Sequence, residues 1–137
     1  MSYRERMSAW RPPGWHSVTP RLVVADPAEM VRFLQNAFDA SCDFAEGAPA
    51  IARIGDSIVM VSAAGPRQAT SALLYLYVED ADATYRRAIA SGATSLEEPA
   101  DMPYGDRRAI IRDPCGNLWQ VATYLRPQPP SMQAERR

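Results

Sequence analysis

Side chains that commonly carry catalysis are scarce in this sequence. The chain has one histidine, His16, and two cysteines, Cys42 and Cys115, which lie far apart and form no CxxC or zinc-ligand pattern. All 15 basic residues are arginine, which excludes a Schiff base on a lysine. No Ser-His-Asp or Cys-His pattern brings a nucleophile to a base. We therefore expect His16 to be exposed or to pack within an N-terminal arm, and the cysteines to be buried free thiols.

Aromatic and polar side chains are spaced instead as a binding surface would require. In the run 73–78, LLYLYV, alternate residues face opposite sides of a strand, so Leu73, Tyr75 and Tyr77 share one face. The leucines and valine between them suit the face that packs on a helix. In the run 18–24, the same alternation leaves Arg21 on the face away from the helix. Rings and an arginine of this kind suit a planar organic ligand.

Two segments with the same order of elements position these side chains. After the first strand, Asp26 and Pro27 predict a helix start, and Asp80 does the same after the run 73–78. Val24-Ala-Asp26 matches Val78-Glu-Asp80, and Gly55-Asp matches Gly116-Asn. The remaining strands are predicted around 41–45, 49–54, 57–62, 94–97, 106–112 and 117–123. The pattern predicts an α+β fold of two βαβββ modules.

Bulk composition limits the class of protein. With 137 residues, 47% of them hydrophobic, the chain suits one globular domain. A net charge of -1 without a basic run argues against nucleic acid or a membrane surface as partner. No apolar run resembles a signal core or a membrane helix, so we expect a cytoplasmic location. We predict an arm over 1–16, a domain over 17–124 with halves of about 17–62 and 72–124, and a flexible tail over 125–137.

Four stretches carry a family resemblance: TPRLVVADPAEMVRFLQNAF, ARIGDSIVMVS, LYLYVEDADATYRRAIASGA and MPYGDRRAIIRDPCGNLWQVAT. Over about 18–124 the chain resembles the vicinal oxygen chelate superfamily, in the PhnB-like form of its glyoxalase/bleomycin-resistance branch. The resemblance implies two modules whose mixed sheet curls around a cavity, with helices on the outer face, usually within a homodimer. Whether the modules pair within one chain or swap between chains is open.

Metal enzymes of this superfamily take one His or Glu ligand from each of four strands. Carried over by the resemblance, these positions are Thr19, Val59, Leu73 and Gln120. Valine and leucine have no donor atom, and a hydroxyl and an amide are weak neutral ligands. Shifting the strands by one or two residues brings in no better donors. We therefore expect neither a metal nor another cofactor.

The resemblance also implies which residues line the cavity. Leu118, Gln120 and Ala122 would point inward from the last strand, and Tyr104 would lie in a loop at the mouth. Trp119, on the opposite face, is expected to pack in the core. The predicted ligand-binding set is Arg21, Val59, Leu73, Tyr75, Tyr77, Tyr104 and Gln120.

Three functional hypotheses follow. The leading one is a metal-independent homodimer that sequesters a small aromatic natural product, such as a bleomycin-like glycopeptide or a peptide antibiotic of the quinoxaline or thiocoraline type. An alternative is a metal-dependent lyase, isomerase or dioxygenase of the same superfamily, with a metal site that the sequence does not show. In a third, the tyrosines fill a closed core and the domain is a structural or regulatory module.

Overall fold

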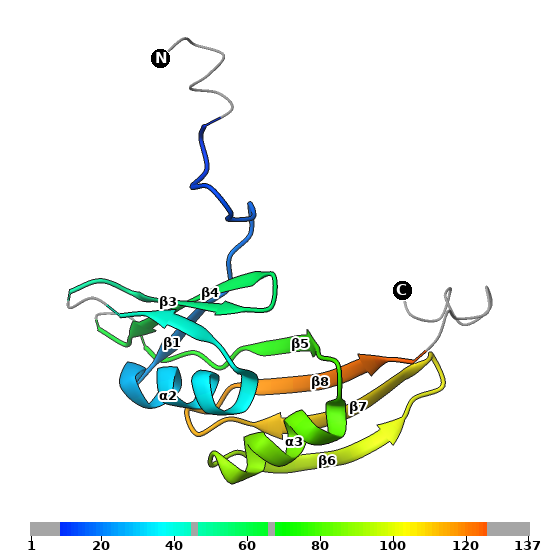
Figure 1. Ribbon diagram of the computed structural model, residues 1–137. Coiled ribbons are helices and arrows are strands. Elements are labelled where there is room, and N and C mark those ends of the chain that lie inside the picture. The colour runs from blue at the N-terminus through cyan, green and yellow to red at the C-terminus, as the bar shows by residue number, and fades with distance from the viewer. Residues whose placement is uncertain (1–8, 45–46, 66–67, 126–137) are drawn as a thin grey trace.

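The computed structural model describes residues 9–44, 47–65 and 68–125, and within them two modules follow each other along the chain (Figure 1). The first contains β1 (Arg21–Val24), α2 (Pro27–Phe38), β2 (Ser41–Asp43), β3 (Ala50–Ile54) and β4 (Ser57–Ala63). The second contains β5 (Leu73–Tyr77), α3 (Ala81–Ala90), β6 (Thr94–Asp101), β7 (Asp106–Arg112) and β8 (Leu118–Tyr124). The predicted α+β fold with two βαβββ modules is confirmed.

Both helices begin where the sequence predicts. The Asp26 carboxylate accepts a hydrogen bond from the Glu29 amide at 3.2 Å, and Pro27 occupies the first turn of α2. Asp80 caps α3 in the same way. The buried residues of α3 are Ala81, Thr84 and Ala88, whereas Ile89 is exposed.

Each module forms its own four-stranded mixed sheet. The strand orders are β1-β4-β3-β2 and β5-β8-β7-β6, and the pairs β1–β4 and β5–β8 are parallel. β6 continues to Asp101 rather than ending near residue 97. Two irregularities in its pairing with β7 accompany this extension. Pro99 is tolerated because β6 is an edge strand and pairs on one side only.

The helices join the two modules. They contact each other, and each packs on its own sheet (Figure 1). At the end of α2, the Phe38 ring packs edge-on against Trp119 of β8, with centroids 4.8 Å apart. One continuous core therefore draws residues from both sheets. The opposite face of each sheet carries most of the predicted binding residues, and no helix of the described residues covers it.

A polar network at the β7–β8 turn holds the start of β8. The buried Asp113 carboxylate accepts hydrogen bonds from the Asn117 amide at 3.0 Å and from the Trp119 indole Nε1 at 2.8 Å. The Asn117 side-chain oxygen in turn accepts from the Ala72 amide at 2.9 Å, which ties this turn to the start of β5. The RDPCGNLW segment is therefore structural, and Trp119 lies in the core as predicted.

The predicted arm and tail are only partly visible. Residues 1–8 of the arm and 126–137 of the tail lie outside the described residues, as does residue 45 of the strand predicted around 41–45. Residues 9–20 run away from the body of the molecule in Figure 1, with Trp10 and His16 exposed. Among the described residues, no helix is long and apolar enough to span a bilayer.

Candidate functional site

The outer face of the second sheet carries four of the predicted site residues. β5 pairs in register with β8, so that Leu73 lies opposite Leu118 and Tyr75 opposite Gln120. Residues paired across adjacent strands project from the same side of a sheet. Leu73, Tyr75, Tyr77 and Gln120 therefore share one face, as predicted. We call this the tyrosine face; it also includes Leu118, Ala122, Asp106, Arg108 and Ile110.

The tyrosine face is open in a single chain. Leu73 is 65% exposed and Tyr77 is 48% exposed, although both are large apolar or aromatic side chains. The Tyr75 and Tyr77 rings lie side by side, with centroids 5.3 Å apart and planes tilted by 55°. The two rings do not fill a closed core, and they offer a surface on which a planar molecule can pack.

Asp106 lies at the hydroxyl ends of the two rings and was not predicted. Its side chain is 0% exposed, and its Oδ2 accepts hydrogen bonds from the Tyr75 hydroxyl at 2.6 Å and the Tyr77 hydroxyl at 2.8 Å. Burial, followed by the hydrogen bonds to Asp106 and Tyr104, raises the pKa of Tyr75 far above its ordinary value. Tyr75 therefore stays a neutral phenol, and the hydrogen bonds to Asp106 fix the positions of both rings.

Tyr104 and Arg108 continue this polar cluster. The Arg108 Nη1 donates to the Tyr104 hydroxyl at 3.1 Å, and its Nη2 donates to Glu97 at 2.6 Å. Tyr104 lies in the loop before β7 and contacts Tyr75, so it adjoins the face as predicted. The sequence signal that we missed is the alternation in β7, where Asp106, Arg108 and Ile110 take the positions that face the tyrosines.

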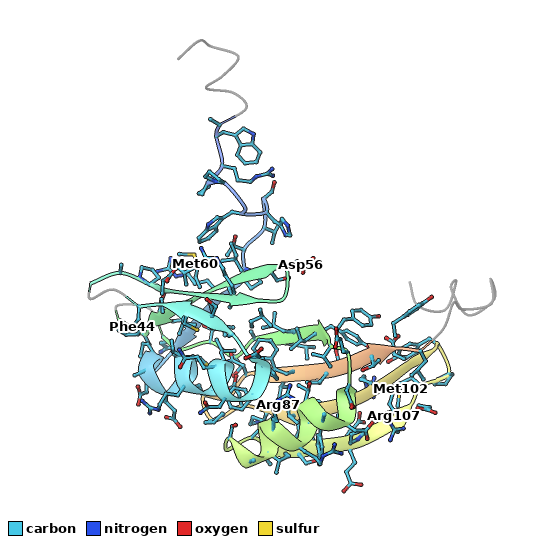
Figure 2. All side chains as sticks on the ribbon, in the orientation of Figure 1. Phe44, Asp56, Met60, Arg87, Met102 and Arg107 are labelled. Carbon is cyan, nitrogen blue, oxygen red and sulfur yellow. The ribbon has the colours of Figure 1, made fainter. Side chains whose placement is uncertain are left out.

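On the first sheet, the predicted register of β4 is wrong by one residue. β1 pairs with β4 so that Arg21 lies opposite Met60, and Val59 therefore belongs to the helix side. Val59 is only 4% exposed and lies in the core, where Val61 joins it. Figure 2 shows Met60 on the side of the sheet opposite α2. Val59 is thus not positioned to touch a ligand, and Met60 takes its place.

The register of β4 was predicted wrongly because the turns before β4 and β8 differ in length. β3 and β4 are joined by Gly55 and Asp56 alone, whereas residues 113–117 join β7 and β8. Gly55 is the first residue of its turn and Gly116 is the fourth of the longer one. Matching the glycines therefore shifted β4 against β8 by one position, which places the wrong side chains on each face.

Arg21 lies on the outer face of the first sheet, where its Nε donates to the Ser62 hydroxyl at 2.8 Å. It lines a cavity of about 430 Å³ together with Phe44, Ala50 and Ser62. The tyrosines line a different cavity of about 900 Å³, between the β3–β4 turn and the region where β5 ends and α3 begins. Within one chain, the structure does not bring Arg21 and the tyrosines into one cavity.

The positions at which the superfamily's metal enzymes hold a metal do not suit one here. With the register corrected, these positions hold Thr19, Met60, Leu73 and Gln120. A hydroxyl, a thioether, an alkyl chain and a neutral amide do not make a site for zinc, nickel, iron or manganese, which take imidazole or carboxylate ligands. Within residues 9–44, 47–65 and 68–125, no three His, Cys, Asp or Glu side chains gather as a metal site needs.

The two cysteines are poor nucleophiles. Burial, followed by the charges of Asp113, Glu29 and Asp26, raises the pKa of the Cys115 thiol to about 11. Burial and the neighbouring Asp43 also raise the pKa of Cys42. Both thiols are free and partly buried. Neither has the lowered pKa of a catalytic thiolate.

Comparison with known proteins decides the family. The profile of the Glyoxalase/Bleomycin resistance protein/Dioxygenase superfamily matches residues 16–121. The chain belongs to this superfamily. Protein Mb0911c of Mycobacterium bovis is 30% identical over 128 residues, which cover 80% of this chain and 84% of that protein. The resemblance in the sequence is thereby confirmed at the level of the superfamily.

Solved structures of superfamily members share the fold. The crystal structure of TioX from Micromonospora sp. ML1 matches with a TM-score of 0.71 and 26% identity, over 80% of this chain and 99% of TioX. A glyoxalase/bleomycin resistance protein/dioxygenase family enzyme from Burkholderia phytofirmans matches with a TM-score of 0.67 and 21% identity, over 77% of this chain and 95% of that one. At 21% identity the second likeness shows the fold alone.

Proposed function

We propose that this superfamily member binds a small aromatic natural product stoichiometrically and without a metal, in the manner of a resistance protein that sequesters a drug. The observation that carries the proposal is the open tyrosine face. Two ordered phenol rings lie beside apolar side chains and a few polar ones, which is the composition of a small-molecule site. The residues at the superfamily's metal positions support binding over metal-dependent chemistry.

We further propose that the working unit is a homodimer. Leu73 and the tyrosines are exposed on one sheet, whereas Arg21 and Met60 lie on the outer face of the other sheet. A second copy that laid its Arg21 face over the tyrosine face would enclose a ligand between them and cover Leu73. A two-fold arrangement would form two such sites at once. The same pairing would unite the predicted binding residues that one chain keeps apart. We place this binding in the cytoplasm.

Binding is tested by isothermal titration of the purified protein with a bleomycin and with a quinoxaline-type peptide antibiotic. We expect saturable binding of at least one of them at one ligand per site. The double variant Tyr75→Ala/Tyr77→Ala removes both rings and should weaken binding at least tenfold, since each stacked ring contributes about 0.5–1.5 kcal/mol beyond its buried area. Tyr85→Ala is the matched control, because Tyr85 lies on α3 and bonds to Ser95.

Several outcomes would contradict the proposal. An absence of binding across aromatic antibiotics would remove its basis, as would equal weakening by Tyr85→Ala. Stoichiometric zinc, nickel, iron or manganese in elemental analysis of the purified protein would favour the metal-dependent enzyme. For the dimer, analytical ultracentrifugation should show two copies per particle and a shift towards monomer for Leu73→Asp. Leu96→Asp, at another exposed leucine, is the control.

A further inference from the structure

The Asp106 carboxylate fixes the direction of the hydrogen bonds under the tyrosine face. A phenol has a single proton to donate, and Tyr75 and Tyr77 both direct theirs to the same oxygen of Asp106. Asp106 is fully buried, so its position does not depend on solvent. With its proton directed to Asp106, each hydroxyl can act towards any further group only as an acceptor.

Arg108 fixes the same direction from the other end. A guanidinium only donates, so the Tyr104 hydroxyl acts as an acceptor towards Arg108 and keeps its own proton for another group. Tyr104 also contacts Tyr75. The cluster therefore runs from a donor-only arginine through tyrosine hydroxyls to an acceptor-only carboxylate. Reversing any one bond would place two donors or two acceptors against each other.

We infer that Asp106 makes the centre of the tyrosine face selective for ligands that bring a hydrogen-bond donor, specifically a protonated amine or guanidinium attached to an aromatic ring. This inference rests on the proposed function and names the chemistry of its ligand. The buried carboxylate adds a negative charge close to the rings, and the faces of two phenols attract a cation as well. Asp106 is a positioning residue, since it acts through the two tyrosines.

The nearest positive charge does not reverse this preference. Arg108 is already paired with Glu97 at 2.6 Å, and its side chain is only 16% exposed. Arg21 belongs to the other sheet and bonds to Ser62. An anionic group that entered between the rings would instead meet the hydroxyl lone pairs and the Asp106 charge. A carboxylate-bearing ligand is therefore disfavoured at this point.

Three probes of one shape test the inference by isothermal titration: naphthylmethylammonium, naphthylmethanol and naphthoate. We expect the ammonium probe to bind about tenfold more tightly than the alcohol, as a charge-assisted hydrogen bond gives, and the naphthoate to bind most weakly. Asp106→Asn should reduce the ammonium-to-alcohol ratio to near one while the alcohol still binds. Asp101→Asn is the matched control, because Asp101 is exposed and pairs with Arg107.

A second variant tests the inference even if Asp106→Asn does not fold. Tyr75→Phe/Tyr77→Phe keeps both rings and removes both hydroxyls, so it should still bind the alcohol. Its ammonium-to-alcohol ratio should lie between those of the parent protein and Asp106→Asn, because the hydroxyl acceptors are lost while the Asp106 charge remains. Equal binding of the three probes, or tightest binding of naphthoate, would overturn the inference and leave aromatic binding intact. Binding of none of the probes, together with none of the antibiotics, would overturn the proposed function as well.

Discussion

Replacing Trp119 by phenylalanine tests the network that holds β8, and through β8 the placement of Gln120. The indole Nε1 donates to the Asp113 carboxylate at 2.8 Å, and both side chains are buried. Phenylalanine keeps an aromatic ring against Phe38 but leaves that carboxylate oxygen without its donor. A buried hydrogen bond to a charged group contributes about 1.5–3 kcal/mol. We therefore expect the free energy of unfolding to fall by about 2 kcal/mol.

Tyr85→Phe is the matched control. It also removes one aromatic hydrogen-bond donor, whose hydroxyl bonds to Ser95 at 2.7 Å, but this bond is exposed and joins two neutral groups. Water replaces such a bond readily, so the loss should stay below about 0.5 kcal/mol. The two variants differ in the burial and charge of the acceptor. Trp119→Phe also makes a buried ring smaller, so its loss should be at least as large as the hydrogen bond alone gives.

The measurement is urea denaturation followed by circular dichroism, with all proteins at one concentration, because dimerisation makes apparent stability depend on concentration. A loss of about 2 kcal/mol corresponds to a fall in melting temperature of roughly 4–8 °C for a domain of this size. If Trp119→Phe and Tyr85→Phe destabilise the protein equally, Asp113 does not hold β8 through the indole. If Trp119→Phe is neutral, the network contributes nothing to stability.

Three further predictions concern local features. Asp26→Ala and Asp80→Ala should each cost about 1 kcal/mol of unfolding free energy in urea denaturation, since each removes a helix cap; an effect at only one site would contradict the repeat of the cap. Cys115 should react with iodoacetamide at pH 8 about a hundredfold more slowly in the folded than in the urea-unfolded protein, because its pKa is raised from 9.0 to about 11; equal rates would exclude a raised pKa. The hydrogen bond from Arg107 lowers the pKa of Asp82, so the stability from this pair is present above the ordinary carboxyl pKa of 3.8 and is lost as the pH falls through the lowered value. Arg107→Gln should flatten the acid limb of a stability–pH curve, and an unchanged curve would refute this linkage.

Local chemistry explains what could be predicted from the sequence. Asp26 and Asp80 predict helix starts because each caps its helix through a hydrogen bond to a residue three positions later. Such local bonds can be predicted without knowing the tertiary structure. The alternation in β5 places Leu73, Tyr75 and Tyr77 on one face because the period of a strand is fixed. The helix caps and the alternation in β5 do not depend on how the two modules pack together.

Features that depend on turn length or on pairing could not be predicted in the same way. The register of β4 depends on how many residues join it to β3, and a single-residue difference moved Val59 into the core. The extension of β6 through Pro99 depends on its place at the sheet edge. Asp106 begins the strand predicted over 106–112, and only the pairing of β7 with β8 brings it to the tyrosine hydroxyls.

The separation between the core and the outer face explains how the proposed binding site could arise without a change of fold. Stability comes from the helix side of each sheet, where Phe38 meets Trp119, and from the Asp113 network. The outer face contributes little to that core, as the exposure of Leu73 shows. Substitutions on this face therefore cost little stability, and the four metal positions can change while the modules remain intact. Because the proposed dimer would cover Leu73, the test is made on the monomer, at a concentration low enough to dissociate the dimer. There Leu73→His should leave the unfolding free energy within about 0.5 kcal/mol of the parent protein. A large loss would mean that the face and the core are coupled in a way that one chain does not show.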